Sequence, residues 1–174
     1  LYTDSILIIA GPTASGKSAL ALNLAKEIDA VIINADSMQV YRELPILTAQ
    51  PGLAEQQETP HHLYGFLSAA APCSVAIWLA HARKAIDAAH QEGKIPLLVG
   101  GTGMYLKALV EGIAEIPEIS QKVREKARTT LNEIGHQAFH IRLNERDPVM
   151  GEKLSPGDTQ RMLRAWEVLD ETSR

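Results

Sequence analysis

Short apolar runs and amphipathic stretches alternate along the first two thirds of the chain. Three runs have the length of buried strands and are rich in aliphatic residues; they cover 5–10, 30–34 and 95–99. After the first run, the apolar residues of 17–28 recur at a spacing that places them on one stripe of a helix. A strand, a helix and a second strand in this order form a βαβ unit with parallel strands. The pattern therefore predicts an α/β fold with a parallel sheet flanked by helices.

Two further helices and one short strand extend the pattern. Apolar residues that step by four, three, four and three positions predict a helix over 74–91, with Ser74 as N-cap and Gly93 just past its end. A second helix is predicted for 104–110 and a short strand for 62–66. These elements bring the predicted sheet to three or four strands, fewer than most doubly wound sheets contain.

The pattern changes at Gly112. No strand signal follows it, and the spacing predicts helices over about 123–135, 148–154 and 158–171. The segment 155–158 has the form of a capping box, with proline at the first helical position. Residues 113–174 hold 21 charged residues, whereas the longer segment 1–112 holds 17. We therefore predict an incomplete core over 1–112 and a separate helical part over 113–174.

The composition limits the class of protein. With 45% hydrophobic and 22% charged residues, the chain is neither disordered nor collagen-like, and no apolar run is long enough to cross a membrane. The first residues show no signal-peptide pattern, and a single cysteine, Cys73, fits a reducing compartment, so we expect a cytoplasmic protein. The net charge of −4 argues against binding nucleic acid by bulk charge alone.

Residues 11–18 read GPTASGKS and carry the strongest chemical signal. Glycines let the backbone curl and point N–H groups at phosphate oxygens, and the helix that follows directs its positive end to the same place. Lys17 adds a point charge, and the Ser18 hydroxyl can bind Mg²⁺. Because the motif lies between a predicted strand and a predicted helix, it indicates a site for a diphosphate or triphosphate rather than an ordinary glycine-rich turn.

The strand ends indicate which phosphate chemistry follows. ATP-hydrolysing enzymes of this class place an acidic residue after a second apolar strand, but 95–99 is followed by glycine, glycine and threonine. Asp36 follows the strand 30–34 instead, so it is expected to face the phosphate site from the carboxyl ends of the strands. One carboxylate beside one phosphate site suggests a transferase that removes a proton from a nucleophile. The alternative is that Asp36 only caps the following turn. The loop 100–103 is either a wall of the same crevice or an ordinary turn.

Two basic groups lie in the helical part. Arg161 and Arg164 are three residues apart on one predicted helix, and their guanidinium groups suit phosphates. A second group comprises Lys122, Arg124, Lys126 and Arg128. Both groups also fit a solvated helix face whose arginines pair with nearby acids. Outside them, His61 and His62 are weak metal candidates because neighbours on an extended chain point to opposite sides.

Several segments together resemble one family, the tRNA dimethylallyltransferases, also called tRNA isopentenyl transferases. The matching segments are GPTASGKS at 11–18, NADSMQVYR at 34–42, PHHLYGF at 60–66, VGGTGMYLKAL at 99–109 and DTQRMLRAWEV at 158–168. The resemblance implies a P-loop-type sheet with a helical, tRNA-binding insertion after the third main strand and the start of a return to the core. It also implies transfer of a dimethylallyl group from its diphosphate to N6 of adenosine 37, beside the anticodon of tRNA.

The resemblance also implies roles for individual residues. It implies that Asp36 is the general base and that Thr13 takes part in catalysis. Mg²⁺ is expected to bind with the diphosphate at Ser18. The diphosphate is expected to contact Gly11, Pro12, Thr13, Ala14, Ser15, Gly16, Lys17 and Ser18. The tRNA is expected to contact Asp36, Ser37, Met38, Gln39, Thr102, Arg124, Gln160, Arg161, Met162, Leu163 and Arg164.

Two departures from the family accompany these expectations. Family members have about 300 residues, so this chain corresponds to an N-terminal fragment, and Trp166 stands where the family more often has leucine. The competing functions are a P-loop kinase of small molecules, an adenylate isopentenyltransferase that acts on free AMP, and a phosphate-binding module without chemistry. The charged segment after Gly112 favours a polymeric substrate, and we expect a monomer.

Overall fold

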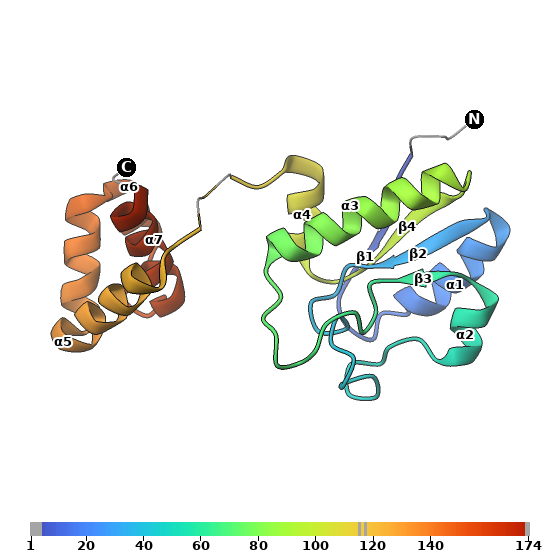
Figure 1. Cartoon of the computed structure of the whole chain (residues 1–174), viewed down its shortest axis with the longest axis horizontal. Coiled ribbons are helices and arrows are strands. Elements are labelled where there is room, and N and C mark those ends of the chain that lie inside the picture. The colour runs from blue at the N-terminus through green and yellow to red at the C-terminus, as the bar shows by residue number, and fades with distance from the viewer. Residues whose placement is uncertain (1–4, 115, 117, 173–174) are drawn as a thin grey trace. The chain divides into compact units, whose positions relative to one another are not determined.

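The computed structural model describes residues 5–114, 116 and 118–172, which divide between a unit that ends at Ile113 and a unit that begins at Ala114 (Figure 1). The first unit contains the parallel sheet and its helices. The second unit is helical. No helix in the described ranges has both the length and the apolar composition that crossing a membrane requires.

The described residues of the first unit form a four-stranded parallel sheet. Its strands are β1 (Leu7–Ala10), β2 (Ala30–Asn34), β3 (His61–His62) and β4 (Ile95–Gly100), in the order β1-β4-β2-β3. The predicted α/β class with a parallel sheet is therefore confirmed. The two strands of the βαβ unit are parallel but not neighbours, because β4 pairs with both of them.

Two of the strand predictions need correction. Leu7 and Ile8 are 38% and 41% exposed, so the predicted burial of the first strand is wrong; among the described strands β1 has only one neighbour. The strand predicted over 62–66 is limited to β3, because Leu63 and Gly65 adopt positive φ angles of 65° and 55° and end the extended backbone.

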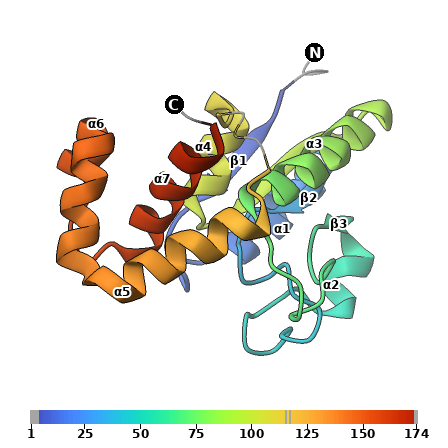
Figure 2. The ribbon, with the colours of Figure 1, turned by 60° about the vertical axis from the view of Figure 1, so that its left-hand side comes forward.

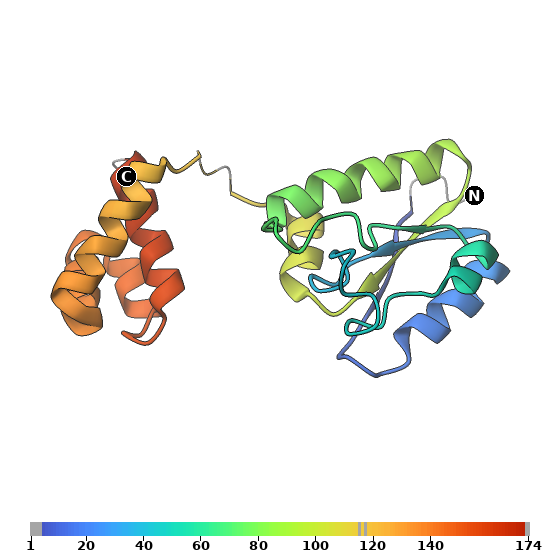
Figure 3. The same ribbon diagram turned by 60° about the horizontal axis from the view of Figure 1, so that its bottom comes forward.

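Helices cover both faces of the sheet, as Figure 3 shows. The side chain of Ile32 in β2 packs with α1 (Lys17–Glu27), whereas Val31 and Ile33 pack with α3 (Val75–Gln91) and α4 (Gly103–Glu111). Every residue of β2 is buried, as expected for a strand covered on both faces. A short helix, α2 (Leu53–Glu58), interrupts the long segment between β2 and β3.

The helix predicted over 74–91 is confirmed together with its ends. Ser74 accepts a hydrogen bond from the Ile77 N–H at 3.2 Å and caps α3. Gly93 has a φ of 72° and donates its N–H to His90. This left-handed conformation is one that glycine adopts without strain, so the helix ends where the sequence indicates.

The second unit contains α5 (Gln121–Arg146), α6 (Pro148–Lys153) and α7 (Thr159–Thr172). Gly135, with φ 75° and ψ 167°, interrupts α5, and the resulting bend is visible in Figure 2. The prediction that a helix ends at Gly135 is right for the first half of α5. It missed the second half, which continues in a new direction to Arg146.

The predicted capping box at 155–158 is wrong. The Asp158 carboxylate accepts hydrogen bonds from the backbone N–H and hydroxyl of Ser155, and the Asp158 N–H returns to the Ser155 carbonyl. These contacts close a turn before the helix. The Met162 N–H bonds to the Asp158 carbonyl, so α7 begins after the turn and Pro156 lies outside it.

The core of the helical unit is built from residues of all three helices. Phe139 is fully buried, and its ring centroid lies 4.4 Å from that of Trp166. The Arg146 guanidinium also lies over the Trp166 ring, 4.4 Å from its centroid. Trp166, the departure from the family pattern, is 7% exposed and is thus part of this core.

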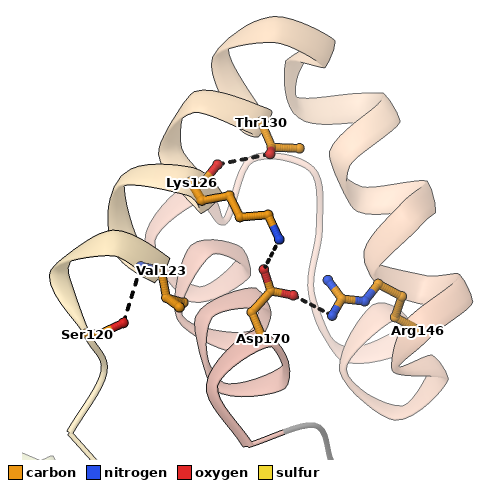
Figure 4. Close-up of polar contacts among 6 residues, drawn as sticks. All are labelled: Ser120, Val123, Lys126, Thr130, Arg146 and Asp170. Carbon is orange, nitrogen blue, oxygen red and sulfur yellow. Dashed lines mark hydrogen bonds and ion pairs between the residues drawn. The ribbon is translucent and has the colours of Figure 1, made fainter.

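A charged contact joins both halves of α5 to α7, as Figure 4 shows. The Asp170 carboxylate, only 12% exposed, lies 2.6 Å from an Arg146 nitrogen and 3.4 Å from the Lys126 ammonium. Burial alone would raise the pKa of Asp170, but the hydrogen bonds and charges of Arg146 and Lys126 outweigh it and lower the pKa below its ordinary value of 3.8. The contact therefore stabilises the bent form of α5.

Candidate active site

The glycine loop connects β1 to α1 and curls through two left-handed residues. Ala14 and Gly16 have φ angles of 63° and 83°, and Gly16 occupies the N-cap position of α1. Among the described residues, no side chain caps this helix, so the first N–H groups of α1 are available to an anion. Lys17 folds back and donates to the Pro12 carbonyl. The loop thus has the curled backbone and the uncapped helix start that the sequence predicted, and its binding of an anion stays a prediction.

A pocket of about 200 Å³ lies over the glycine loop. Residues 13–19 line one side, and Asp36 and Gln39 line another. Val99 and Gly100 contribute from the end of β4. Six of the eight residues predicted to contact the diphosphate, 13–18, thus surround the pocket together with the predicted base.

Asp36 combines two roles at this position. Its Oδ1 atom accepts a hydrogen bond from the Met38 N–H at 2.8 Å, which confirms the interpretation as a turn cap. The same residue lines the pocket beside Lys17 and Ser18. Since a carboxylate has a second oxygen, the turn contact leaves Oδ2 for a ligand; no hydrogen bond to Oδ2 is found within the described part of the chain.

The loop 100–103 packs against both neighbouring strand ends. A Cβ atom on Gly100 would lie 2.2 Å from the Ala35 carbonyl, and one on Gly101 would lie 2.8 Å from the Gly11 oxygen. Only glycine permits these approaches. The Thr102 hydroxyl accepts a hydrogen bond from the Ser37 N–H at 2.9 Å. The expectation that this loop is a wall of the crevice is confirmed at Gly100, while Thr102 supports the turn after β2.

The wall formed by Thr48 and Ala49 was not predicted from the sequence. The Gln39 side-chain amide donates to the carbonyls of Thr48 and Ala49 at 2.8 and 2.9 Å and holds this loop at the pocket. Gln39, expected to contact tRNA, therefore has a structural contact as well. Nothing in the local pattern marks Thr48 or Ala49, because a loop without periodicity is placed by distant hydrogen bonds.

Asn34 was not among the candidates from the sequence, although its position gave a signal. It is a polar residue at the end of an otherwise apolar strand, and the structure buries it completely. Buried polar side chains are retained where they satisfy specific hydrogen bonds.

The helical unit contains the remaining candidates. Arg124 is exposed on α5, where it neighbours the exposed Lys122 and Arg128. Met162 is fully buried in the core of the unit, so its side chain cannot contact tRNA in this structure, which corrects that expectation. Lys126 is engaged by Asp170, so it differs from the other members of the basic group.

Arg161 and Arg164 line one pocket of about 430 Å³ in the helical unit, so the prediction that they share a face is confirmed. Its other walls are largely apolar, from Met150, Val168 and Leu169 among others. Arg164 also lies 3.7 Å from Glu167, as expected for an arginine that pairs with a nearby acid. Gln160 and Leu163 lie on the same helix, exposed and half-buried respectively.

His61 has contacts that account for its burial without a metal. Its Nδ1 atom lies 2.7 Å from the Thr59 carbonyl, and its ring meets Tyr64 edge-on at 5.6 Å. Burial lowers the pKa of His61 and favours the neutral ring. Over the residues that the structure describes, no three metal-binding side chains form a group.

Known protein families match nearly the whole chain. The model of a family described as IPP transferase matches residues 39–174, and that of a family described as isopentenyl transferase matches residues 4–64. The chain belongs to the IPP transferase family. A relative from Rhodospirillum rubrum, a tRNA dimethylallyltransferase, is 52% identical over 169 residues, which cover 97% of this chain and 52% of the relative. One from Rhizobium johnstonii with the same name is 47% identical over 100% of this chain and 59% of that relative.

Solved structures agree with this assignment to the IPP transferase family. A eukaryotic dimethylallyltransferase acting on tRNA gives a TM-score of 0.84 at 31% identity, over 97% of this chain and 42% of that one. A tRNA isopentenylpyrophosphate transferase from Bacillus halodurans gives a TM-score of 0.62 at 34% identity, over 96% and 55%. The chain spans about half the length of the relatives that it matches. The family predicted from the sequence is thus confirmed.

Proposed function

We propose that this chain is the diphosphate-binding part of an enzyme that transfers a dimethylallyl group from dimethylallyl diphosphate to N6 of adenosine 37 in tRNA. The observation that carries the proposal is the pocket in which Asp36 faces the glycine loop. The names of the relatives support the substrates. Asp36 supplies one acid beside one anion site, which suits a transferase of this kind.

In the proposed reaction, the glycine loop holds the leaving group. The N–H groups of the loop and the Lys17 ammonium contact the diphosphate, and the Thr13 hydroxyl donates to it. The Ser18 hydroxyl is an oxygen ligand of the kind that Mg²⁺ prefers, so Ser18 would hold this ion. When bound, Mg²⁺ neutralises charge on the diphosphate.

The proposed reaction requires Asp36 to accept a proton. The N6 lone pair forms a bond to C1 of the dimethylallyl group, and the C1–O bond to the diphosphate breaks. Positive charge builds on N6, which then loses a proton to the Asp36 carboxylate. Oδ2 is the oxygen that takes it, because Oδ1 already accepts the Met38 N–H.

The tRNA is proposed to contact residues in both units. Ser37, Met38 and Thr102 lie at or beside the turn that carries Asp36. In the helical unit, Arg124, Arg161 and Arg164 offer positive charge for phosphates, and the exposed Gln160 offers a polar group. We propose that the helical unit is the tRNA-gripping insertion of a cytoplasmic, monomeric enzyme.

The decisive experiment uses the full-length protein with unmodified tRNA and dimethylallyl diphosphate, followed by mass spectrometry of the nucleosides. A dimethylallyl group on adenosine 37, formed much more slowly by the Lys17→Ala variant, is the expected result. Transfer to free AMP but not to tRNA would indicate an adenylate isopentenyltransferase. Steady turnover of ATP, with phosphate passed to a small molecule, would replace the proposal with a kinase.

A further inference from the structure

The Asn34 side chain uses its hydrogen-bonding capacity on the turn that carries Asp36. Its Oδ1 atom accepts the Asp36 N–H at 2.8 Å. Its Nδ2 atom donates to the Asp36 carbonyl at 3.0 Å and to the Leu63 carbonyl at 3.0 Å. The side-chain amide therefore hydrogen-bonds to both the N–H and the carbonyl of Asp36. It also connects that residue to Leu63, in the segment after β3.

Asn34 is itself held by a buried aromatic pair. The Trp78 indole N–H donates to the main-chain carbonyl of Asn34 at 2.9 Å, and Trp78 is fully buried. The Trp78 ring stacks on Tyr105 with centroids 4.5 Å apart and planes 12° from parallel. Because α3 supplies Trp78 and α4 supplies Tyr105, the position of Asn34 is tied to the core of the sheet.

The other side of the turn is fixed by the end of β4. The Ala35 N–H donates to the Val99 carbonyl at 2.8 Å, and the Thr102 N–H donates to the Ala35 carbonyl at 3.2 Å. Gly100 allows this approach, since any Cβ there would also lie 2.7 Å from the Asp36 nitrogen. The turn that carries Asp36 is thus held by the Asn34 side chain on one side and by backbone hydrogen bonds with Val99 and Thr102 on the other.

We propose that Asn34 is a positioning residue for the transfer reaction. It fixes the backbone of Asp36 so that the carboxylate stands at the pocket before the substrates bind. Asn34 does not line the pocket, so it acts through Asp36 and not on the substrates. The proposal rests on the proposed function. A displacement of a reacting group by about 1 Å can cost on the order of 10²-fold in rate, and Asn34 prevents such a displacement.

The test is a double-mutant cycle between Asn34→Ala and Asp36→Asn, measured by single-turnover kinetics with both substrates saturating. We expect Asn34→Ala to lower the rate by roughly 10- to 100-fold in the parent and by less than roughly threefold in the Asp36→Asn background. The KM for the diphosphate should stay near the parent value. An equal loss in both backgrounds, or a rise in KM alone, overturns the proposal.

Two variants separate positioning from general damage to the fold. Ile86→Ala removes a buried side chain from the same core two helical turns from Trp78, so it should lower stability without the loss in rate. Trp78→Phe keeps a stacked ring but removes the donor to Asn34, and it should give a smaller loss than Asn34→Ala. If Ile86→Ala slows transfer as much as Asn34→Ala does, and the two variants lose similar stability, the slower transfer comes from damage to the core. Asn34 then has no positioning role. If Asn34→Ala does not fold, Asn34→Ser, a smaller polar change at the same position, takes its place in the cycle.

Amide hydrogen exchange gives a readout that does not depend on the reaction. Loss of the Oδ1 acceptor should speed exchange of the Asp36 N–H by roughly tenfold or more, while the Ile33 N–H in the middle of the sheet changes little. Unchanged exchange at Asp36 would contradict the positioning role even if the protein transfers a dimethylallyl group. Faster exchange in a protein that transfers none would instead locate the error in the proposed function.

Discussion

The α/β unit and the helical unit hold their candidate residues in different ways. In the α/β unit, Asp36 and the glycine loop lie at the ends of paired strands, and backbone hydrogen bonds fix the turns that carry them. In the helical unit, arginines project from helix faces whose position depends on side-chain packing and on the Asp170 contact. A site on strand ends is therefore rigid at the backbone, whereas the charges on a helix surface depend on side-chain contacts for their position.

The charged residues of the two units also differ in their surroundings. Lys17 and Asp36 line one pocket at the uncapped start of α1. In the helical unit, Lys126 and Arg146 share one carboxylate and Arg164 approaches Glu167. A count of basic residues thus overstates what such a surface can offer to phosphates.

Asp36→Asn should have the largest effect, because it removes the proposed base and keeps the size of the side chain. We expect the single-turnover rate with saturating substrates to fall by roughly 10²–10⁴-fold while diphosphate binding is retained. Asp87→Asn, an exposed change of the same kind on α3, is the matched control. A variant at Asp36 that turns over like the parent would reduce this residue to a turn cap.

Lys17→Ala should weaken diphosphate binding next most strongly. A lost charge-assisted hydrogen bond is worth about 1.5–3 kcal/mol, which corresponds to roughly 10- to 150-fold in Kd. Calorimetry with dimethylallyl diphosphate and with pyrophosphate measures the change, and Lys84→Ala on the exposed face of α3 serves as the control. The same Kd for the parent and the Lys17 variant would remove Lys17 from the site.

Asp170→Asn tests the ion contact of the helical unit. It should lower the free energy of unfolding of this unit by about 1–3 kcal/mol, since the charged hydrogen bonds of a carboxylate that is only 12% exposed are weakened. The chain has two tryptophans, Trp78 and Trp166, one in each unit, so fluorescence of a Trp78→Phe background reports the helical unit alone. Denaturant unfolding with and without Asp170→Asn in that background gives the difference.

The same contact predicts a pH dependence with a definite sign. Because the pKa of Asp170 is lowered in the folded unit, its stabilisation is complete above the ordinary value of 3.8 and is lost as the pH falls through the lower folded value. As the pH falls below 3.8, the free energy of unfolding should therefore decrease more for the parent than for Asp170→Asn. Parallel pH profiles for the two proteins would show that the contact contributes nothing.

Charge reversal at Arg124 and Arg128 should give the smallest effect and the clearest view of the helical surface. If these residues bind phosphates, tRNA binding weakens and the slope of log K against log salt falls by about 0.7–0.9 for each phosphate that is no longer neutralised. Arg83→Glu with Lys84→Glu makes the same charge change on the exposed face of α3. Equal effects of the two pairs would mean that the group on α5 is only a solvated face.

The sequence alone determined the features that depend on short spans of chain. The apolar runs predicted the strands, the periodicity predicted α3 with both of its ends, and GPTASGKS predicted a loop with anion-binding geometry. It also placed Asp36 correctly at a strand end, because carboxyl ends of parallel strands meet at one edge. These predictions hold because hydrogen bonds and side-chain spacing within short segments decide them.

Only the tertiary structure decided what depends on contacts between distant residues. It placed β4 between β1 and β2, so that Gly100 could pack on the Asp36 turn, and it brought Thr48 and Ala49 to the pocket through Gln39. It also continued α5 beyond Gly135 against α6 and α7. The pattern within each segment is compatible with several such arrangements. The choice among them is made by burial and hydrogen bonding with partners far away in the sequence, which no local spacing encodes.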